Sequence, residues 1–252
     1  MPAIFIGHGT PMNAIEQNEF TDGWKEIAAS FAKPKAILSI SAHWVTDGTK
    51  ILSSVKPRTI HDFYGFPQKL YNIEFPANGS PELAKKTLNL LNSIATLDNT
   101  WGLDHGTWSV LHVMYPDADI PVYQLSLDYY ATPEQMFDIG NKLQALRDDD
   151  VLILGSGNIV HNLTRVEFDN INGFDWALKF DNYILNCVLQ KDYAGILNYK
   201  SLGNIANLAV PTNEHFSPLL YILGSINKDE NVTVYNQKCF GGSISMTSFV
   251  FK

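Results

Sequence analysis

Three short apolar runs that end in turns limit the folds open to this chain more than any other feature of its sequence. They are Ala3–Ile6, which passes into Gly7-His8-Gly9, Ala36–Ser41, which passes into Ala42-His43-Trp44, and Val151–Leu154, which passes into Gly155-Ser156-Gly157. Apolar runs of this length, bounded by turn residues, are typical of strands buried on both faces of a sheet. Helices cover both sides of such sheets, so the runs predict an α/β fold.

The first two runs are separated by a predicted helix, because Phe20, Trp24 and Ile27 recur there at helical spacing. A strand-helix-strand crossover places its two strands parallel, so both strands end at the same edge of the sheet. His8 and His43 therefore leave the sheet at its carboxyl edge, where open α/β sheets bind ligands. We expect the active site there.

The rest of the pattern predicts one domain over residues 1–252, with a central sheet that is mostly parallel or mixed and helices on both faces. Further helices are expected over 81–91, 107–115, 133–146 and 176–187 and from Thr212 or Asn213 to Leu223, and further strands over 120–127, 232–235 and 243–251. Residues 45–79 are rich in turn-forming residues, and within them Ile60–Pro67 is expected to form an ordered aromatic loop that could serve as a lid.

The charge and the apolar content exclude several classes of protein. Lys and Arg total 18 against 26 Asp and Glu, and the resulting net charge of −8 offers no field that attracts nucleic acid. No stretch approaches the roughly 18 apolar residues of a membrane span, and no basic leader precedes the first strand, so a cytoplasmic protein is expected. Cys187 and Cys239 are predicted to be reduced core residues.

Seven histidines are the most informative polar residues. His8, His43 and His161 all follow apolar strands, and neutral imidazoles that converge at one edge of a sheet suit a borderline divalent metal. Either Glu214 or His215 can complete the ligand set, and His215 is favoured because Glu214 is also explained as an anion near a helix start. His105 lies beside Gly106 before a predicted helix and is a candidate active-site residue, whereas His112 is expected to be structural.

Other chemistries lack their sequence motifs. Gly155-Ser156-Gly157 follows a strand like a dinucleotide-binding turn, but Val160 stands where the third glycine is required for close helix packing. No serine-hydrolase elbow, phosphate-binding loop or His-Glu-x-x-His segment is present.

Several blocks in order along nearly the whole chain resemble the extradiol ring-cleaving dioxygenases of the catalytic LigB superfamily, in the 4,5-DOPA dioxygenase extradiol-like branch. The blocks are Phe5–Asn13, Ser41–Trp44, Thr59–Phe63, Asp104–Trp108, Tyr115–Pro121, Gly157–Asn162 and Glu214-His215. The resemblance implies that His8, His43 and His215 hold the metal. It also implies that His161 is the acid/base residue or a fourth metal contact, and that His105 faces the substrate.

The same resemblance implies that the substrates are a small aromatic diol and O2. Fe(II) is expected for activity because dioxygen activation needs a redox metal, and Zn(II) is expected as an inactive occupant of a histidine-rich site. His161 is suited to taking a phenolic proton and returning it while the ring opens beside the diol. Trp44, Phe63, Tyr64 and Trp108 are candidates to bind the planar ring. A homodimer is left open.

Two alternatives use the same histidines. A zinc-dependent hydrolase would lower the pKa of a bound water, with Glu214 or His161 as its base. In a non-catalytic metal-binding protein, the histidines would serve stability alone.

Overall fold

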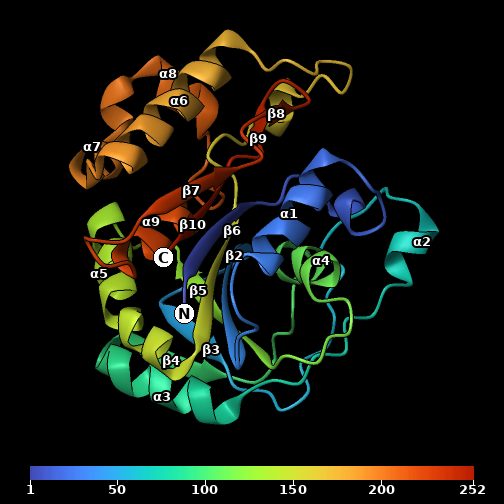
Figure 1. The fold of residues 1–252 in the computed structure, drawn as a ribbon, viewed down its shortest axis with the longest axis vertical. Helices are drawn as coiled ribbons and strands as arrows, with labels where there is room; N and C mark the ends of the chain where they lie inside the picture. The colour runs from blue at the N-terminus through green and yellow to red at the C-terminus, as the bar shows by residue number, and fades with distance from the viewer.

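An eight-stranded mixed sheet forms the centre of the molecule in the computed structural model, which describes residues 1–252 (Figure 1). Its strands are β1 (Ala3–Gly7), β2 (Ala36–Thr46), β3 (Thr49–Leu52), β4 (Ala95–Asp98), β5 (Val122–Asp128), β6 (Val151–Gly157), β7 (Val232–Tyr235) and β10 (Ser248–Phe251). They lie in the order β4-β3-β5-β2-β6-β1-β10-β7, and β8 (Cys239–Phe240) pairs separately with β9 (Ile244–Ser245). The predicted α/β class with a mixed sheet is confirmed.

Four strands at the centre of the sheet run parallel. β6 lies between β1 and β2, with Ala3 opposite Ile153 and Ala36 opposite Val151, and β5 pairs with the other side of β2. Because these strands point the same way, the carboxyl ends of β1, β2 and β6 meet at one edge of the sheet. That edge carries the turns that the sequence marks with histidine.

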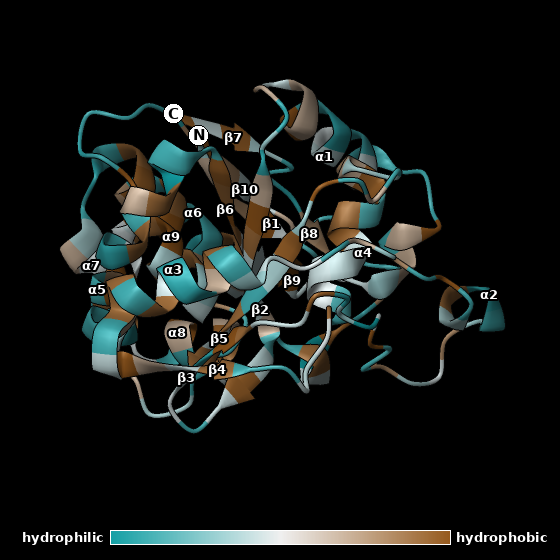
Figure 2. Ribbon diagram, turned by 90° about the horizontal axis from the view of Figure 1, so that it is seen from below, coloured by the Kyte–Doolittle hydropathy of each residue, from teal (hydrophilic) through white to brown (hydrophobic).

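Helices cover both faces of the sheet. They are α1 (Glu19–Ala29), α2 (Gln68–Tyr71), α3 (Pro81–Leu91), α4 (His105–Met114), α5 (Pro133–Leu143), α6 (Asp175–Gln190), α7 (Tyr193–Leu197), α8 (Asn204–Ala209) and α9 (Ser217–Gly224). Helices α1 and α4 contribute to the core on one face, while α3, α5, α6 and α9 contribute to the core on the other. In Figure 2 the central strands are mostly brown, and the helices beside them alternate between hydrophilic and hydrophobic residues.

Alternation along β1 explains how one strand serves both cores. Ala3 and Phe5 belong to the core on the α9 side, whereas Ile4 and Ile6 belong to the core on the α4 side. Successive side chains of a strand point to opposite faces, so a strand buried on both sides must be apolar throughout. All five residues of β1 are buried. The continuous apolar run in the sequence has this cause.

Several predicted boundaries are wrong, and three of them bear on the site or the sheet. β2 continues to Thr46, through a register shift against β5 between Ile40 and Val45, so His43 lies within the strand instead of after it. The last helix begins at Ser217 and not at residue 212 or 213, because Pro218 lacks an N–H and fits only the first turn. The predicted strand over 243–251 is divided into β9 and β10.

The two cysteines are free and buried, as predicted. None of the helices combines the length and the apolar composition that crossing a bilayer requires.

Candidate functional site

Five of the seven histidines gather at the carboxyl edge of the sheet, although they come from five separate parts of the chain. His8 follows β1 directly, and His43 lies near the end of β2. His105 is the first residue of α4, His161 lies four residues beyond the end of β6, and His215 precedes α9. His61 and His112 lie outside this cluster. His61 faces the carbonyl of Ile73 at 3.0 Å, and His112 lies in the last turn of α4.

The closest pair of ring nitrogens joins His8 to His43. Their Nε2 atoms are 3.3 Å apart, and the ring of His215 lies 5.2 Å from that of His8 and 5.0 Å from that of His43, centroid to centroid. One nitrogen from each of these three residues falls within 4.8 Å of the other two. This spacing meets the first requirement for ligands of a single ion.

The tautomer of His8 follows from its surroundings. The Ser156 hydroxyl donates to the carbonyl of Gly106 at 2.5 Å, so it accepts from Nδ1 of His8 at 2.9 Å. With its proton on Nδ1, His8 turns the lone pair of Nε2 toward His43. Two nitrogens bound to one ion at about 2.1 Å lie roughly 3.0 to 3.4 Å apart, which matches the observed separation from His43.

Oxygen atoms also lie near Nδ1 of the other two candidate ligands. Nδ1 of His43 is 3.2 Å from Oδ2 of Asp62, and Nδ1 of His215 is 3.5 Å from Oε1 of Glu214. Nδ1 of His215 is enclosed and has no hydrogen-bond partner. A metal centre built from these residues therefore fits the donor chemistry, since metal-bound histidines are held by an oxygen at their other nitrogen.

Burial keeps these imidazoles neutral. It lowers the pKa values of His8, His43 and His215 well below the usual value, and the neighbouring imidazoles lower them further. Burial also lowers the pKa of His161 to about 4, although the charge of Glu214 opposes this shift. Neutral imidazole is the form that binds a metal or accepts a proton.

His105 is held by an aspartate from the loop opposite. Asp62 accepts the backbone N–H of His105 at 2.8 Å and lies 2.9 Å from its Nδ1. Burial raises the pKa of Asp62, but hydrogen bonds from His105 and the nearby His43 outweigh it, and the net shift is downward. With its proton on Nδ1, His105 presents Nε2 as a hydrogen-bond acceptor.

The start of α4 is built around a buried carboxyl. Asp104 caps the helix at Thr107, as predicted, and also accepts from Ser41 at 2.6 Å and Gln124 at 2.7 Å. Burial and the charge of Asp62 raise its pKa. The hydroxyl of Ser41 also accepts the backbone N–H of His43 at 3.2 Å, so Asp104 fixes the positions of α4 and of His43 together.

Gly106 allows α4 to approach β2 closely. A Cβ atom at this position would lie 2.5 Å from Oγ of Ser41 and 2.9 Å from Cδ2 of His43. Any larger residue would displace one of these groups, so the glycine beside His105 has a packing role.

The aromatic candidates occupy different environments. The ring of Phe63 is 5.5 Å from that of His105, and buried Trp108 donates from its indole to the carbonyl of Ile60, which anchors the loop. Trp44 is buried and stacks on Trp101 at 5.7 Å. Tyr64 is 92% exposed. The structure therefore brings Phe63 to the histidine cluster and places Tyr64 in solvent.

Sequence reasoning missed the residues that hold the histidines. In the sequence, Ser156, Asp62 and Ser41 belong to turns and motifs, and nothing there indicates that each contacts a histidine of the site. The one available signal was that each lies one or two residues from a glycine, histidine or aromatic residue of a motif.

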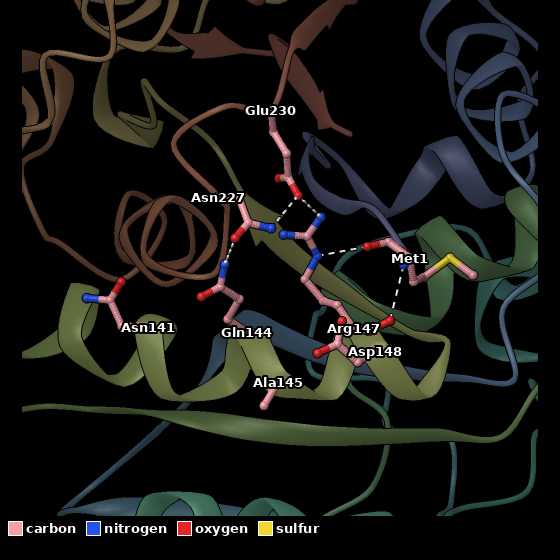
Figure 3. A pocket seen from close by; sticks show the side chains of 8 residues that line it. All are labelled: Met1, Asn141, Gln144, Ala145, Arg147, Asp148, Asn227 and Glu230. Carbon is pink, nitrogen blue, oxygen red and sulfur yellow. Dashed lines mark hydrogen bonds and ion pairs between the residues drawn. The ribbon is translucent and has the colours of Figure 1, made fainter.

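A cavity of about 420 Å³ lies at the opposite edge of the sheet, beside Met1 and the segment before β6 (Figure 3). Arg147 donates there to the carbonyls of Met1 and Ser225 and pairs with Glu230 at 2.6 Å. These contacts already occupy the polar groups of the arginine. We assign this network to stability.

Comparison with known proteins places the chain among dioxygenases. Residues 2–251 match the family model described as the catalytic LigB subunit of aromatic ring-opening dioxygenase. The chain is 43% identical to a protein of Escherichia coli (strain K12) named 4,5-DOPA dioxygenase extradiol, over 98% of this chain and 93% of that protein. A protein of the same name from Beta vulgaris is 38% identical, over 98% and 95%. The crystal structure of an uncharacterised protein from Escherichia coli K12 matches with a TM-score of 0.88 and 38% identity, covering 100% of both chains.

Proposed function

The chain belongs to the LigB family of aromatic ring-opening dioxygenases, and we propose that its histidine cluster is the metal centre at which it opens the ring of a catechol. It is an extradiol dioxygenase. The relatives named for 4,5-DOPA support a DOPA-like catechol as the substrate class. The observation that carries the proposed centre is the 3.3 Å separation between Nε2 of His8 and Nε2 of His43.

We assign His8, His43 and His215 as the protein ligands of the metal. A bound metal would hold a diol beside O2 and lower the pKa of the phenolic groups. Fe(II) is the active ion in this proposal because O2 activation requires a redox metal, whereas Zn(II) binds the same nitrogens without supplying that chemistry.

His161 is assigned as the acid/base residue. Its ring lies beside the ligand set without belonging to the His8-His43-His215 group, and its lowered pKa leaves it neutral at pH 7. A neutral imidazole can accept a phenolic proton as the diol binds and return it to the opened product. We therefore assign His161 to proton transfer beside the metal ligands, where its ligand atom lies within 4.8 Å of those of Glu214 and His215.

His105 and Phe63 are assigned to the substrate. The hydrogen bond to Asp62 directs Nε2 of His105 away from the loop, as an acceptor for a substrate hydroxyl. The Phe63 ring stands edge-on to His105 at an interplanar angle of 85° and supplies an apolar wall for a planar ring. Trp108 is assigned an indirect role, because it anchors the loop that carries Phe63.

Anaerobic reconstitution of the metal-free protein tests the function. The Fe(II)-loaded protein should consume O2 only when a catechol is present and should form a yellow ring-opened product, while the Zn(II)-loaded protein should not. A panel of DOPA, dopamine and catechol carboxylates ranks the substrates. Hydrolysis of esters or amides by the Zn(II) form, without catechol-dependent O2 uptake by the Fe(II) form, would refute the proposal in favour of a zinc hydrolase.

A further inference from the structure

We propose that Asp62 and Glu214 neutralise the metal from outside its ligand set, an inference that rests on the metal centre proposed above. Three neutral histidines bring no charge to a divalent ion, unlike the sites in which two histidines and one carboxylate bind it. The two carboxylates, called here the outer carboxylates, stand behind two of the three ligand histidines. Together they carry a formal charge equal and opposite to that of the ion.

Asp62 is fixed behind His43. Its Oδ2 lies 3.2 Å from Nδ1 of His43 and 2.9 Å from Nδ1 of His105, and its Oδ1 accepts the backbone N–H of His105 at 2.8 Å. A ring nitrogen that faces a carboxylate oxygen carries its proton, because two lone pairs would repel each other. His43 therefore turns Nε2 toward the ion, and the carboxylate polarises the ring in the direction that strengthens the ligand.

Glu214 occupies the corresponding position behind His215. Its Oε1 accepts from the hydroxyl of Thr212 at 2.7 Å and lies 3.5 Å from Nδ1 of His215. That nitrogen is buried and lacks any other polar partner, so Glu214 is the only group placed to receive its proton. We infer that His215 also binds through Nε2.

No basic side chain compensates these two charges. Neither Asp62 nor Glu214 forms an ion pair with a lysine or arginine. The basic groups near them are histidines of the cluster, with His43 and His105 beside Asp62 and with His215 and His161 beside Glu214. The two carboxylates are partly shielded from water, with side chains 18% and 30% exposed, and such shielding favours a positive partner nearby. The ion between the histidines is the partner that the fold leaves for them.

His8 provides the internal contrast. The group behind its Nδ1 is the neutral hydroxyl of Ser156, at 2.9 Å. A neutral hydroxyl is therefore enough to orient a ligand histidine in this site. The carboxylates behind His43 and His215 do more than orient these rings, because they also bring negative charge close to the ion. That effect is electrostatic, and replacement of the carboxylate by an amide of the same shape removes it while keeping an oxygen behind the ring.

Metal affinity measured without turnover tests the proposal. Metal-free wild type, Asp62→Asn, Glu214→Gln and the double variant are titrated with Zn(II) in competition with a chromophoric chelator at fixed pH and ionic strength. Glu26→Gln, an exposed position on α1, is the control with the same change in net charge. Glu214→Asp keeps the charge and tests rescue, and thermal unfolding in the presence of chelator reports on folding.

Each single amide variant should bind Zn(II) about 10- to 100-fold more weakly than wild type, and the double variant more weakly than either. Glu26→Gln should match wild type, and Glu214→Asp should recover most of the affinity that Glu214→Gln loses. Folded amide variants that bind within twofold of wild type would overturn the inference and leave the proposed function standing. Failure of wild type to bind any divalent ion would overturn both, whereas normal binding without ring opening would refute only the function.

Discussion

The imidazole of His161 lies flat against that of His215, with ring centroids 3.5 Å apart and 6° between the planes. The stack holds His161 beside the proposed ligands while the side chain stays partly exposed. The stack therefore supports the proposed assignment of His161 as the acid/base residue beside the metal ligands.

Replacing His161 by Ala should therefore leave metal content unchanged and lower kcat by about 10²- to 10⁴-fold, the usual contribution of an acid/base group. Metal analysis and O2 uptake on the same Fe(II)-loaded sample measure both quantities. His8→Ala is the contrasting variant and should lose the metal as well. Loss of metal from the His161 variant would instead make His161 a fourth ligand.

Acid should destabilise the metal-free protein through its buried histidines. Burial lowers the pKa values of His8, His43 and His215 in the folded state, whereas the unfolded chain protonates them below about pH 6.5. The unfolded state then binds more protons, so the free energy of unfolding falls as the pH drops below that value. Each histidine contributes up to about 1.4 kcal/mol per pH unit.

Urea unfolding between pH 7.5 and pH 5, with chelator present, measures this slope. His43→Gln removes one of these histidines and should flatten the slope. A urea midpoint that does not change between pH 7.5 and pH 5 would contradict the prediction that burial keeps His8, His43 and His215 neutral in the folded protein.

Asp181 should have the opposite pH dependence. This carboxyl on α6 accepts from Ser245 and Thr247, and burial raises its pKa to about 6. The folded state then holds a proton that the unfolded chain releases near pH 4, so stability is lost as pH rises from about 4 to 6 and the loss is complete above that. Asp181→Asn should be more stable than wild type at pH 7.5 by up to about 3 kcal/mol, and by less at pH 5. Thermal unfolding of wild type and Asp181→Asn at both pH values measures this effect. A stability difference between the two proteins that is the same at pH 5 and pH 7.5 would contradict the raised pKa of Asp181.

Arg147 should be essential for stability and irrelevant to the metal. Its guanidinium is 7% exposed and joins Met1 and Ser225 to Glu230 (Figure 3). Arg147→Met removes the charged partner of the largely shielded Glu230 carboxylate, which keeps only its hydrogen bond from Asn227, and should cost about 3 to 5 kcal/mol in urea unfolding. The double change Arg147→Met with Glu230→Gln should recover part of this loss. Zn(II) affinity should remain that of wild type in every variant that folds.

The sequence predicts the parts of this molecule that depend on local pattern. His8 and His43 could be placed at one edge because an apolar run, a helix and a second run force two parallel strands. The start of α9 was misplaced because the capping residues Thr212 and Asn213 suggested an earlier beginning, and Pro218 decides the boundary. More than one residue near the end of a helix can mark its boundary, and the packing of the folded protein decides which of them does.

The residues that orient the histidines could not be predicted in the same way. Ser156 meets His8 across 148 positions of sequence, and Asp62 meets His105 across 43. No periodicity records such pairs, since a serine or an aspartate in a turn has many routine explanations. Only the pairing of strands and the packing of the loop bring them together.

The arrangement of β1 has a consequence for the newly made chain on the ribosome. This strand is held between β6 and β10, and residues 248–251 of β10 are synthesised long after residues 3–7 of β1. Until they emerge, an entirely apolar strand has an open hydrogen-bonding edge that can pair with another nascent chain. Slow synthesis of the segment that carries β10 should therefore favour aggregation of the nascent chain.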